Sequence, residues 1–321
     1  MTRARVTMLF IVTALVTACA GTPPQVESYP AMAARRVTVH GAEIHYFDFH
    51  PDAPGRPIVF LHGYSGSGFE AMFFHDDLGS DRRLIAPDFP GAGLSDKPEI
   101  EYTLDYYVKF VEAFIHELEL DEFDLVGHSM GGLVTTAYVA SRDPTIDRLV
   151  LIAPLGVPGS AGAFNEFIAR TGALVDVGLG LNNRTFMQTA MRMNVFHDPD
   201  ALPPDLLDYL ATASLHTPNG RGALASVTHN IIAAERDASL FEEIDVPTLI
   251  IWGENDDVLG SRFAPEVERR IRESELHLIA ECGHMPHVEQ SEITARLIRE
   301  FLDRGRDDPE TEPQPPASPE A

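Results

Sequence analysis

A serine between two glycines is the residue of this chain best placed for chemistry. The stretch Gly127-His128-Ser129-Met130-Gly131 follows an apolar run over 123–126 and precedes a helix-forming run over 133–140. A tight turn between a strand and a helix needs glycines, because a Cβ there would collide with the neighbouring backbone. The turn would lift the Ser129 hydroxyl clear of the sheet and place the next N–H at a helix N-terminus. Ser129 is therefore the candidate nucleophile.

A serine nucleophile needs a base to take its proton and an acid to orient that base. Both should follow the carboxyl ends of strands, at the edge of the sheet where Ser129 lies. One apolar run ends in Trp252-Gly253-Glu254-Asn255-Asp256-Asp257, and a later one leads into Cys282-Gly283-His284-Met285-Pro286-His287. These two segments supply the candidate acids and bases, in the chain order serine, aspartate, histidine.

Short apolar strands alternate with helical stretches along most of the chain. The expected strands cover 36–40, 43–49, 57–61, 83–86, 123–126, 147–153, 247–252 and 275–280, and the expected helices cover 104–118, 133–140, 264–272 and 293–302. This alternation predicts an α/β fold, a mostly parallel doubly wound sheet of about eight strands with helices on both faces.

Residues 155–240 break the alternation and contain no convincing strand. They predict a helical cap inserted after the sixth core strand. Its large apolar residues suggest a pocket for an apolar acyl chain or simply a packed core, since Met side chains adapt to irregular shapes. These residues are Phe164, Phe167, Phe186, Met187, Met191 and Met193.

Several motifs together make the chain resemble the α/β-hydrolase family over roughly residues 37–303. They are His62-Gly63, Asp88-Phe89-Pro90-Gly91-Ala92-Gly93-Leu94-Ser95, the turn around Ser129, Trp252-Gly253-Glu254-Asn255-Asp256 and Gly283-His284. The resemblance implies that Ser129 is the nucleophile, Asp256 the orienting acid and His284 the general base. Asp256 is preferred to Asp257 because the family's acid lies three residues after the glycine, and His284 is preferred to His287 because it directly follows the family's glycine.

The same resemblance implies an oxyanion hole made by the backbone N–H groups of Tyr64 and Met130, and a reaction that needs no metal and no cofactor. Neighbouring polar residues are expected to be structural. His128 should point away from the reacting atom, Asp88 should anchor its loop through backbone N–H groups, and Cys282 should be a small buried residue. Asp257 should be solvated or cap a helix.

The N-terminus predicts export. Arg3 and Arg5 precede an apolar run over 6–18 that is shorter than the ~20 residues of a spanning helix, as in a secretory signal. Val16-Thr17-Ala18-Cys19 resembles the lipobox of bacterial lipoproteins, which implies cleavage before Cys19 and its acylation. The alternative is an ordinary signal that ends near Ala20. Ala20 after the cysteine favours the outer membrane of a two-membrane envelope, with the protein facing the periplasm.

The expected organisation follows from these observations. It comprises a signal peptide (1–18), a spacer (19–35), a first core segment (36–154), the cap (155–240), a second core segment (241–305) and a disordered acidic, Pro-rich tail (306–321). A formal net charge of −25 argues against a nucleic-acid partner. No particular oligomeric state is predicted.

The expected activity is hydrolysis of a small carboxylic ester with an apolar acyl group. The alternatives are a carbon–carbon bond hydrolase, a cofactor-free peroxidase, an acyltransferase and, least in keeping with an intact triad, a binding protein without activity. Dehalogenases and epoxide hydrolases of this family use an aspartate at the nucleophile position, so Ser129 argues against both activities.

Overall fold

The computed structural model describes residues 33–141, 146–160, 184–215, 219–234 and 238–304. The expected signal peptide with Cys19, most of the expected spacer and the expected tail therefore lie outside the described residues, as do Phe164 and Phe167. The domain boundaries given above remain predictions.

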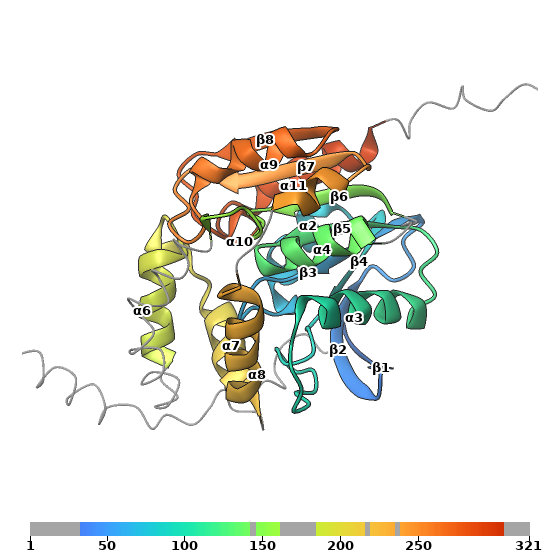
Figure 1. Ribbon diagram of the computed structural model, residues 1–321, viewed down its shortest axis with the longest axis vertical. Helices are drawn as coiled ribbons and strands as arrows, with labels where there is room; N and C mark the ends of the chain where they lie inside the picture. The colour runs from blue at the N-terminus through green and yellow to red at the C-terminus, as the bar shows by residue number, and fades with distance from the viewer. Residues whose placement is uncertain (1–32, 142–145, 161–183, 216–218, 235–237, 305–321) are drawn as a thin grey trace, which may run out of the picture.

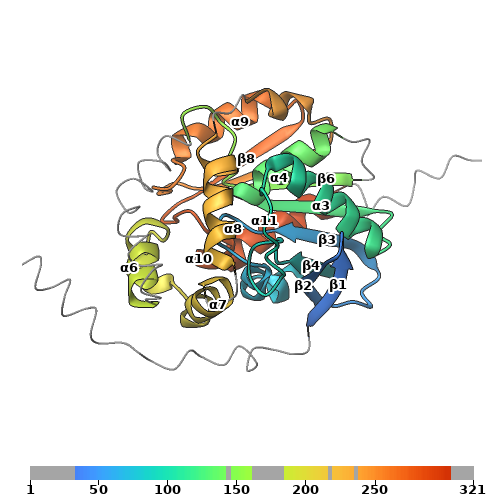
Figure 2. The same ribbon diagram turned by 60° about the horizontal axis from the view of Figure 1, so that its bottom comes forward.

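In the described residues, one sheet of eight strands forms the centre of the protein (Figure 1). The strand order is β1-β2-β4-β3-β5-β6-β7-β8, with β1, β2 and β4 antiparallel and the other pairs parallel. Figure 2 shows β1 and β2 at one end of the sheet and β8 at the other. The strands are β1 (Ala34–Val39), β2 (Ala42–Phe49), β3 (Gly55–Leu61), β4 (Arg82–Pro87), β5 (Phe123–His128), β6 (Ile146–Ile152), β7 (Thr248–Gly253) and β8 (Ser274–Ile279).

The predicted α/β fold with its mostly parallel sheet is thus confirmed. The central strands are apolar because helices cover both of their faces; every residue of β5 and β7 is buried. The outer strand β1 is instead half-buried or exposed over most of its length, and only Val39 at its end is buried. It starts at Ala34, two residues before the predicted strand, through pairing of Ala34 with Phe47.

The direction in which successive strands are added to the sheet reverses between β3 and β5, and this reversal marks the edge where a site is expected. The chain moves from β3 to β4 on one side and then crosses to β5 on the other side of β3. Leu61 pairs with Gly127, so the residues that follow both strands leave the sheet side by side. In open α/β sheets ligands bind in the crevice at such a switch point, beyond the carboxyl ends of the strands.

The helices form a layer on each face of the sheet. The helices α3, α4 and α9 belong to one apolar cluster, through Phe110, Val134 and Val267. Two further helices, α2 and α11, belong to the other cluster, through Leu78 and Ile298. The bounds are α2 (His75–Leu78), α3 (Leu104–Glu117), α4 (Met130–Ser141), α9 (Ala264–Arg270), α10 (Pro286–Glu289) and α11 (Ser291–Asp303).

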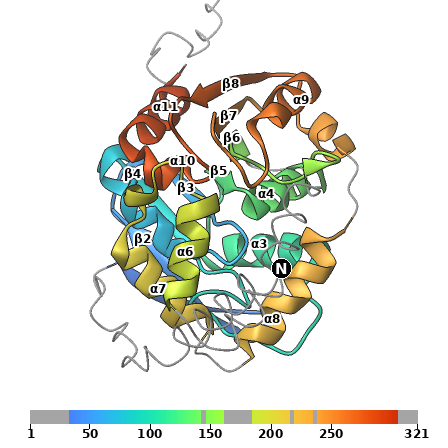
Figure 3. The ribbon, with the colours of Figure 1, turned by 90° about the vertical axis from the view of Figure 1, so that its left-hand side faces the viewer.

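A helical insertion follows β6, as predicted, and its described residues contain no strand. It comprises α6 (Arg184–Asn194), α7 (Pro204–Leu215), α8 (Gly220–Val227) and a π-helical turn (Thr228–Ile232), with one 3₁₀ segment between α6 and α7 and another after the π-helical turn. Figures 1 and 3 show these helices together on one side of the core. They contact the loops beyond the strands: Thr228 Oγ1 lies 2.7 Å from Tyr64 Oη, and His284 N–H donates to Val195 O at 2.7 Å.

The described residues also form four short 3₁₀ helices that were not predicted. They are Gly68–Phe73, Pro199–Ala201, Ala238–Glu243 and Ser261–Phe263. Throughout the described ranges, every helix is too short or too polar to cross a bilayer.

Close packing of α4 on β3 requires a glycine at position 131. A Cβ on Gly131 would run into the backbone carbonyls of Leu61 and His62, which cannot move without the strand. We expect Gly131→Ala to lower the free energy of unfolding by about 1–3 kcal/mol, measured by urea denaturation. The control is Gly222→Ala on α8, where the new Cβ meets only the side chain of Asn219 and the helix gains a better former. Equal stability of Gly131→Ala and wild type would contradict this view of the packing.

Candidate active site

Ser129 occupies a strained turn between β5 and α4. Its φ is +52°, a left-handed conformation that non-glycine residues rarely adopt and that costs of order 1–3 kcal/mol. The turn is held by backbone hydrogen bonds: Ser129 N–H donates to Ile152 O, and Leu155 N–H donates to Ser129 O, both at 2.9 Å. A Cβ on Gly127 would lie 2.7 Å from Gly131 O. The structure therefore has the predicted tight turn, and this turn requires a glycine at position 127.

The loop after β3 lies directly against Ser129. A Cβ on Gly63 would be 2.9 Å from His128 Nδ1 and 3.2 Å from Ser129 Cβ, so a glycine favours this close approach. His62 orders the loop: its Nδ1 donates to Gly63 O at 2.8 Å, and its Nε2 accepts from Phe89 N–H at 3.0 Å. Since a carbonyl can only accept, the proton of His62 is on Nδ1. The Tyr64 backbone is thereby fixed beside the nucleophile, and Met130, as the first residue of α4, has an N–H without a partner inside the helix.

His284 and Asp256 form a buried pair, with 2.8 Å between Nδ1 and Oδ2. Asp256 also accepts from Trp252 Nε1 at 2.8 Å and from the N–H groups of Val258 and Leu259 at 2.8 and 3.0 Å. Burial opposes ionisation, but His284 and the two backbone donors outweigh it and hold the pKa of Asp256 below its ordinary value.

The charged Asp256 thus keeps the His284 proton on Nδ1 and leaves Nε2 as a base. Asp257 is exposed, as predicted for a solvated residue. It is Asp256 and His284, rather than their neighbours Asp257 and His287, that the fold brings together.

His128 connects the nucleophile segment to the base. Its Nε2 donates to the carbonyl oxygen of His284 at 3.0 Å, and the two rings lie 4.9 Å apart. Ser129 and His284 are both buried, each with 5% of its surface exposed. In the described ranges, the His284 ring forms a hydrogen bond with Asp256 but none with Ser129 Oγ. Contacts of this kind between a catalytic histidine and its nucleophile often shorten when substrate binds.

Glu70 lies behind this turn and was missed in the sequence. Its Oε2 is 3.0 Å from His287 Nε2 and 3.5 Å from His128 Nδ1, and all three side chains are buried. Burial opposes ionisation of Glu70, but the two histidine rings outweigh it and hold the pKa of Glu70 well below its ordinary value. Burial in turn lowers the pKa of His128 to about 4. The network joins the 3₁₀ helix over 68–73 to both the nucleophile segment and the base segment.

A local signal could have pointed to Glu70. Ser67 and Glu70 have the spacing of a capping box, and both of its hydrogen bonds are formed here. This spacing does not predict that the second carboxylate oxygen of Glu70 contacts His128 and His287, because both histidines are distant in sequence.

Asp88 anchors its loop through backbone N–H groups, as predicted. It accepts from Gly68 N–H at 2.7 Å and from Leu94 N–H at 2.8 Å. It also contacts His45 Nδ1 at 2.9 Å and accepts from Tyr209 Oη, on the cap, at 3.1 Å.

Cys282 is fully buried, and burial raises the pKa of its thiol, which agrees with a structural role.

Two groups of side chains in the described residues have the composition and spacing of metal ligands. One is Glu70 with His128 and His287, where the 3.0 Å separation of Glu70 Oε2 and His287 Nε2 is that of a hydrogen bond. The other is His50 with His75 and Asp76, outside the active site. Neither group contains Ser129, Asp256 or His284.

A pocket of about 580 Å³ adjoins the acid side of the site. It is formed by the end of α6 and the loop after β7, and it includes Arg192, Phe196, Asp256 and Arg262. Its charged lining differs from the apolar acyl pocket that the cap composition suggested, and Ser129 is not part of it.

The chain is similar to hydrolases over most of its length. The sequence profile described as the alpha/beta hydrolase family matches residues 58–297. The chain is 29% identical over 282 residues to a 2-hydroxy-6-oxo-2,4-heptadienoate hydrolase of Pseudomonas putida, covering 85% of this chain and 97% of that protein. It is 28% identical over 265 residues to a human monoacylglycerol lipase, covering 77% of each.

The fold is also similar to the crystal structure of a membrane phospholipase A described as a bacterial virulence factor. The TM-score is 0.73 at 23% identity, with coverage of 96% of this chain and 94% of that one. At this level of identity the likeness concerns the fold alone.

The Glu70 network predicts a pH-dependent loss of stability. We expect Glu70→Gln to lower the free energy of unfolding at pH 7 by roughly 1.5–3 kcal/mol, because it removes a charged hydrogen-bond acceptor. The pKa of Glu70 is lower in the folded chain than the ordinary ~4.3, so its contribution is complete above that pH and is lost as the pH falls below it.

Urea denaturation of wild type and Glu70→Gln at pH 7 and at successively lower pH tests this. The difference between the two proteins should shrink below about pH 4.3. Glu43→Gln, at an exposed carboxylate, is the control. A difference that is absent at pH 7, or that grows as the solution is acidified, would contradict the assignment.

Proposed function

The chain belongs to the alpha/beta hydrolase family, and on that premise we propose that it hydrolyses carboxylic esters through an acyl-serine intermediate. The observation that carries the proposal is the strained Ser129 turn, set beside a histidine whose ring is held by a buried, ionised aspartate. A hydroxyl becomes an effective nucleophile where a base is fixed nearby in the correct tautomer.

In the proposed reaction, Ser129 Oγ attacks the ester carbonyl as His284 Nε2 takes its proton. The negative charge that develops on the carbonyl oxygen is held by the N–H groups of Tyr64 and Met130. His284 then gives the proton to the leaving alcohol, and an acyl group remains on Ser129. Water attacks this acyl group with His284 again as base, which releases the carboxylic acid and restores the hydroxyl.

Both contributions are of known size in other enzymes. One oxyanion-hole donor contributes about 2.7–4 kcal/mol to stabilising the transition state, and a positioned general base about 10²–10⁴ in rate. The donors here are backbone groups on a loop fixed by His62 and on the first turn of α4, so they need little reorganisation.

An apolar acyl group is the proposed substrate feature. Met187 and Met191 on α6 are partly buried against the apolar cluster that also contains Met285, next to His284. Flexible thioether side chains adapt to acyl chains of varied shape. Similarity to a monoacylglycerol lipase supports a lipid-like ester.

A carbon–carbon bond hydrolase is the second candidate. It is favoured by the similarity to the heptadienoate hydrolase, whose name describes a dienoate substrate. The same serine, histidine and aspartate would serve either reaction, so the substrate and not the triad distinguishes the two.

Removal of the nucleophile should abolish ester turnover. We expect Ser129→Ala to lower kcat for short p-nitrophenyl esters by at least about 10³-fold, while the unfolding transition stays cooperative. Ser141→Ala, at the end of α4 and away from the site, should keep wild-type activity. Retained esterase activity in Ser129→Ala would contradict the assignment of the nucleophile.

The two candidate reactions separate on a substrate panel. We expect purified wild-type protein to hydrolyse p-nitrophenyl esters of graded acyl length with higher kcat/KM than a vinylogous 2-hydroxy-6-oxo-dienoate. Cleavage of the dienoate is monitored by the loss of its absorbance. Efficient dienoate cleavage with little ester turnover would instead favour the carbon–carbon bond hydrolase.

We further propose that the protein is exported and anchored through acylated Cys19. The support is the lipobox-like stretch at 16–19, since several acyl chains hold a protein durably on a membrane at about 0.8 kcal/mol per buried methylene. Cys19→Ser should move the protein from the membrane to the soluble fraction on cell fractionation. Unchanged partitioning would contradict anchoring and would leave the proposed esterase activity untouched.

A further inference from the structure

Two histidines and an aspartate converge at the edge of the sheet opposite the active site. Their ligand-type atoms all lie within 4.8 Å of one another. His50 directly follows β2, and His75 and Asp76 begin α2. Phe49 pairs with Leu84 near the start of β4, whereas the active site lies beyond the other end of that strand. The group is therefore separate from Ser129 and its partners.

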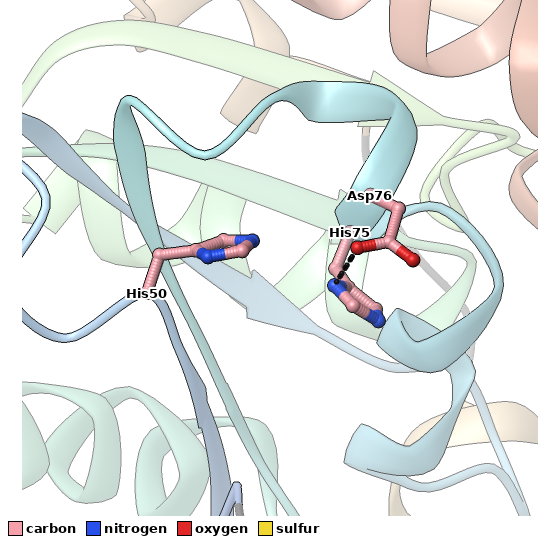
Figure 4. Close-up of side chains that lie close together, drawn as sticks. All are labelled: His50, His75 and Asp76. Carbon is pink, nitrogen blue, oxygen red and sulfur yellow. Dashed lines mark ion pairs between the residues drawn. The ribbon is translucent and has the colours of Figure 1, made fainter.

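One ring nitrogen of each histidine lacks a hydrogen bond in the described structure. His50 Nε2 and His75 Nδ1 are buried atoms without a hydrogen-bond partner there. Figure 4 shows the His50 ring pointing toward His75 and Asp76, which come from a neighbouring segment. His75 Nδ1 is 3.3 Å from Asp76 Oδ1, an ion-pair contact. Buried polar atoms without partners cost free energy, and a cation between the two rings would satisfy both nitrogens, with the Asp76 carboxylate within reach as a third ligand.

Both rings are held in place by their surroundings. The His75 ring stacks on Phe49, with centroids 4.2 Å apart and an interplanar angle of 12°. His50 has a φ of +52°, in a turn closed by the hydrogen bond from Ala53 N–H to His50 O at 3.0 Å. The His50 and His75 centroids are 5.9 Å apart. The two rings thus need little ordering to act together.

The spacing suits a small transition-metal ion. Zinc–nitrogen bonds of about 2.0–2.1 Å put two ligating atoms no more than roughly 4.2 Å apart, so atoms within 4.8 Å require only a small movement. Imidazole nitrogen favours Zn²⁺ over Ca²⁺ or Mg²⁺, which prefer oxygen ligands. The Asp76 side chain is 86% exposed, which gives an ion access from solvent and leaves a coordination position for water.

We propose that His50, His75 and Asp76 form a Zn²⁺ site that ties the turn after β2 to the start of α2. The ion bonds to one nitrogen of each histidine and to a carboxylate oxygen, with water in the fourth position. Its role is to stabilise this edge of the fold, since none of its ligands belongs to the proposed catalytic machinery.

The test measures Zn²⁺ binding by isothermal titration calorimetry, using untagged full-length protein stripped with a chelator. The expected result is one equivalent bound, with an increase in Tm on addition of Zn²⁺. His50→Ala should weaken that binding by at least about tenfold, since even outer-shell partners of a metal contribute 10–100-fold. His75→Phe should do the same while it keeps the stacking on Phe49, which separates loss of a ligand from loss of packing.

The matched control is His277→Ala. His277 is a surface histidine whose Nε2 lies 3.8 Å from Glu275, and it is not part of a three-ligand group in the described ranges. It should leave Zn²⁺ affinity unchanged, and all three variants should keep wild-type ester hydrolysis as a sign of correct folding. If wild type binds Zn²⁺ no more tightly than His50→Ala and His75→Phe do, the proposed site is refuted.

Discussion

The backbone conformation of Ser129 is the constraint on which the rest of the site depends. A left-handed residue between a buried strand and a helix is unfavourable unless the surroundings impose it. Here Ile152 and Leu155 bond to its backbone from the neighbouring strand and the loop after it, and Gly127 and Gly131 leave room for the turn to close. The strain is thereby balanced by the core of the sheet, and the hydroxyl stays at the switch point between β3 and β5.

Buried polar contacts hold the loops around that turn. His62 fixes the loop after β3, Asp88 joins the loop after β4 to the cap, and His128 joins the nucleophile segment to the His284 backbone. Glu70 extends this network beneath the site. Polar groups buried in this way are costly unless every partner is in place, so they favour one arrangement of the loops over others. Positions of the proposed oxyanion donors follow from this arrangement.

The sequence predicts the parts of the molecule that depend on local patterns. Glycine spacing identified the Ser129 turn, apolar runs identified the eight strands to within about two residues, and the loss of alternation after residue 154 identified the inserted helices. Strands that end at one edge supplied the candidate acids and bases, and the resemblance to the α/β-hydrolase family selected Asp256 and His284 among them. Apart from that selection, these features need only neighbouring residues and the rules of parallel sheets.

The remaining features depend on contacts between distant segments. Glu70 meets His287 across 217 positions, and His50 meets His75 through the packing of α2 against the turn after β2. The partners of Asp88 on β2 and on the cap were not expected either, although its role as a loop anchor was. Spacing along the chain holds no information on such pairs, because register and packing decide which side chains meet.

The central claim is that acyl transfer occurs at Ser129, and it can be observed directly. Wild-type protein would be mixed with a p-nitrophenyl ester, quenched in acid during turnover, digested and analysed by peptide mass spectrometry. The account predicts an added acyl mass on Ser129, and its accumulation should disappear in His284→Ala. An acyl group on another residue, or ester hydrolysis that proceeds without any trapped adduct while an independent fluorophosphonate probe fails to label Ser129, would contradict it.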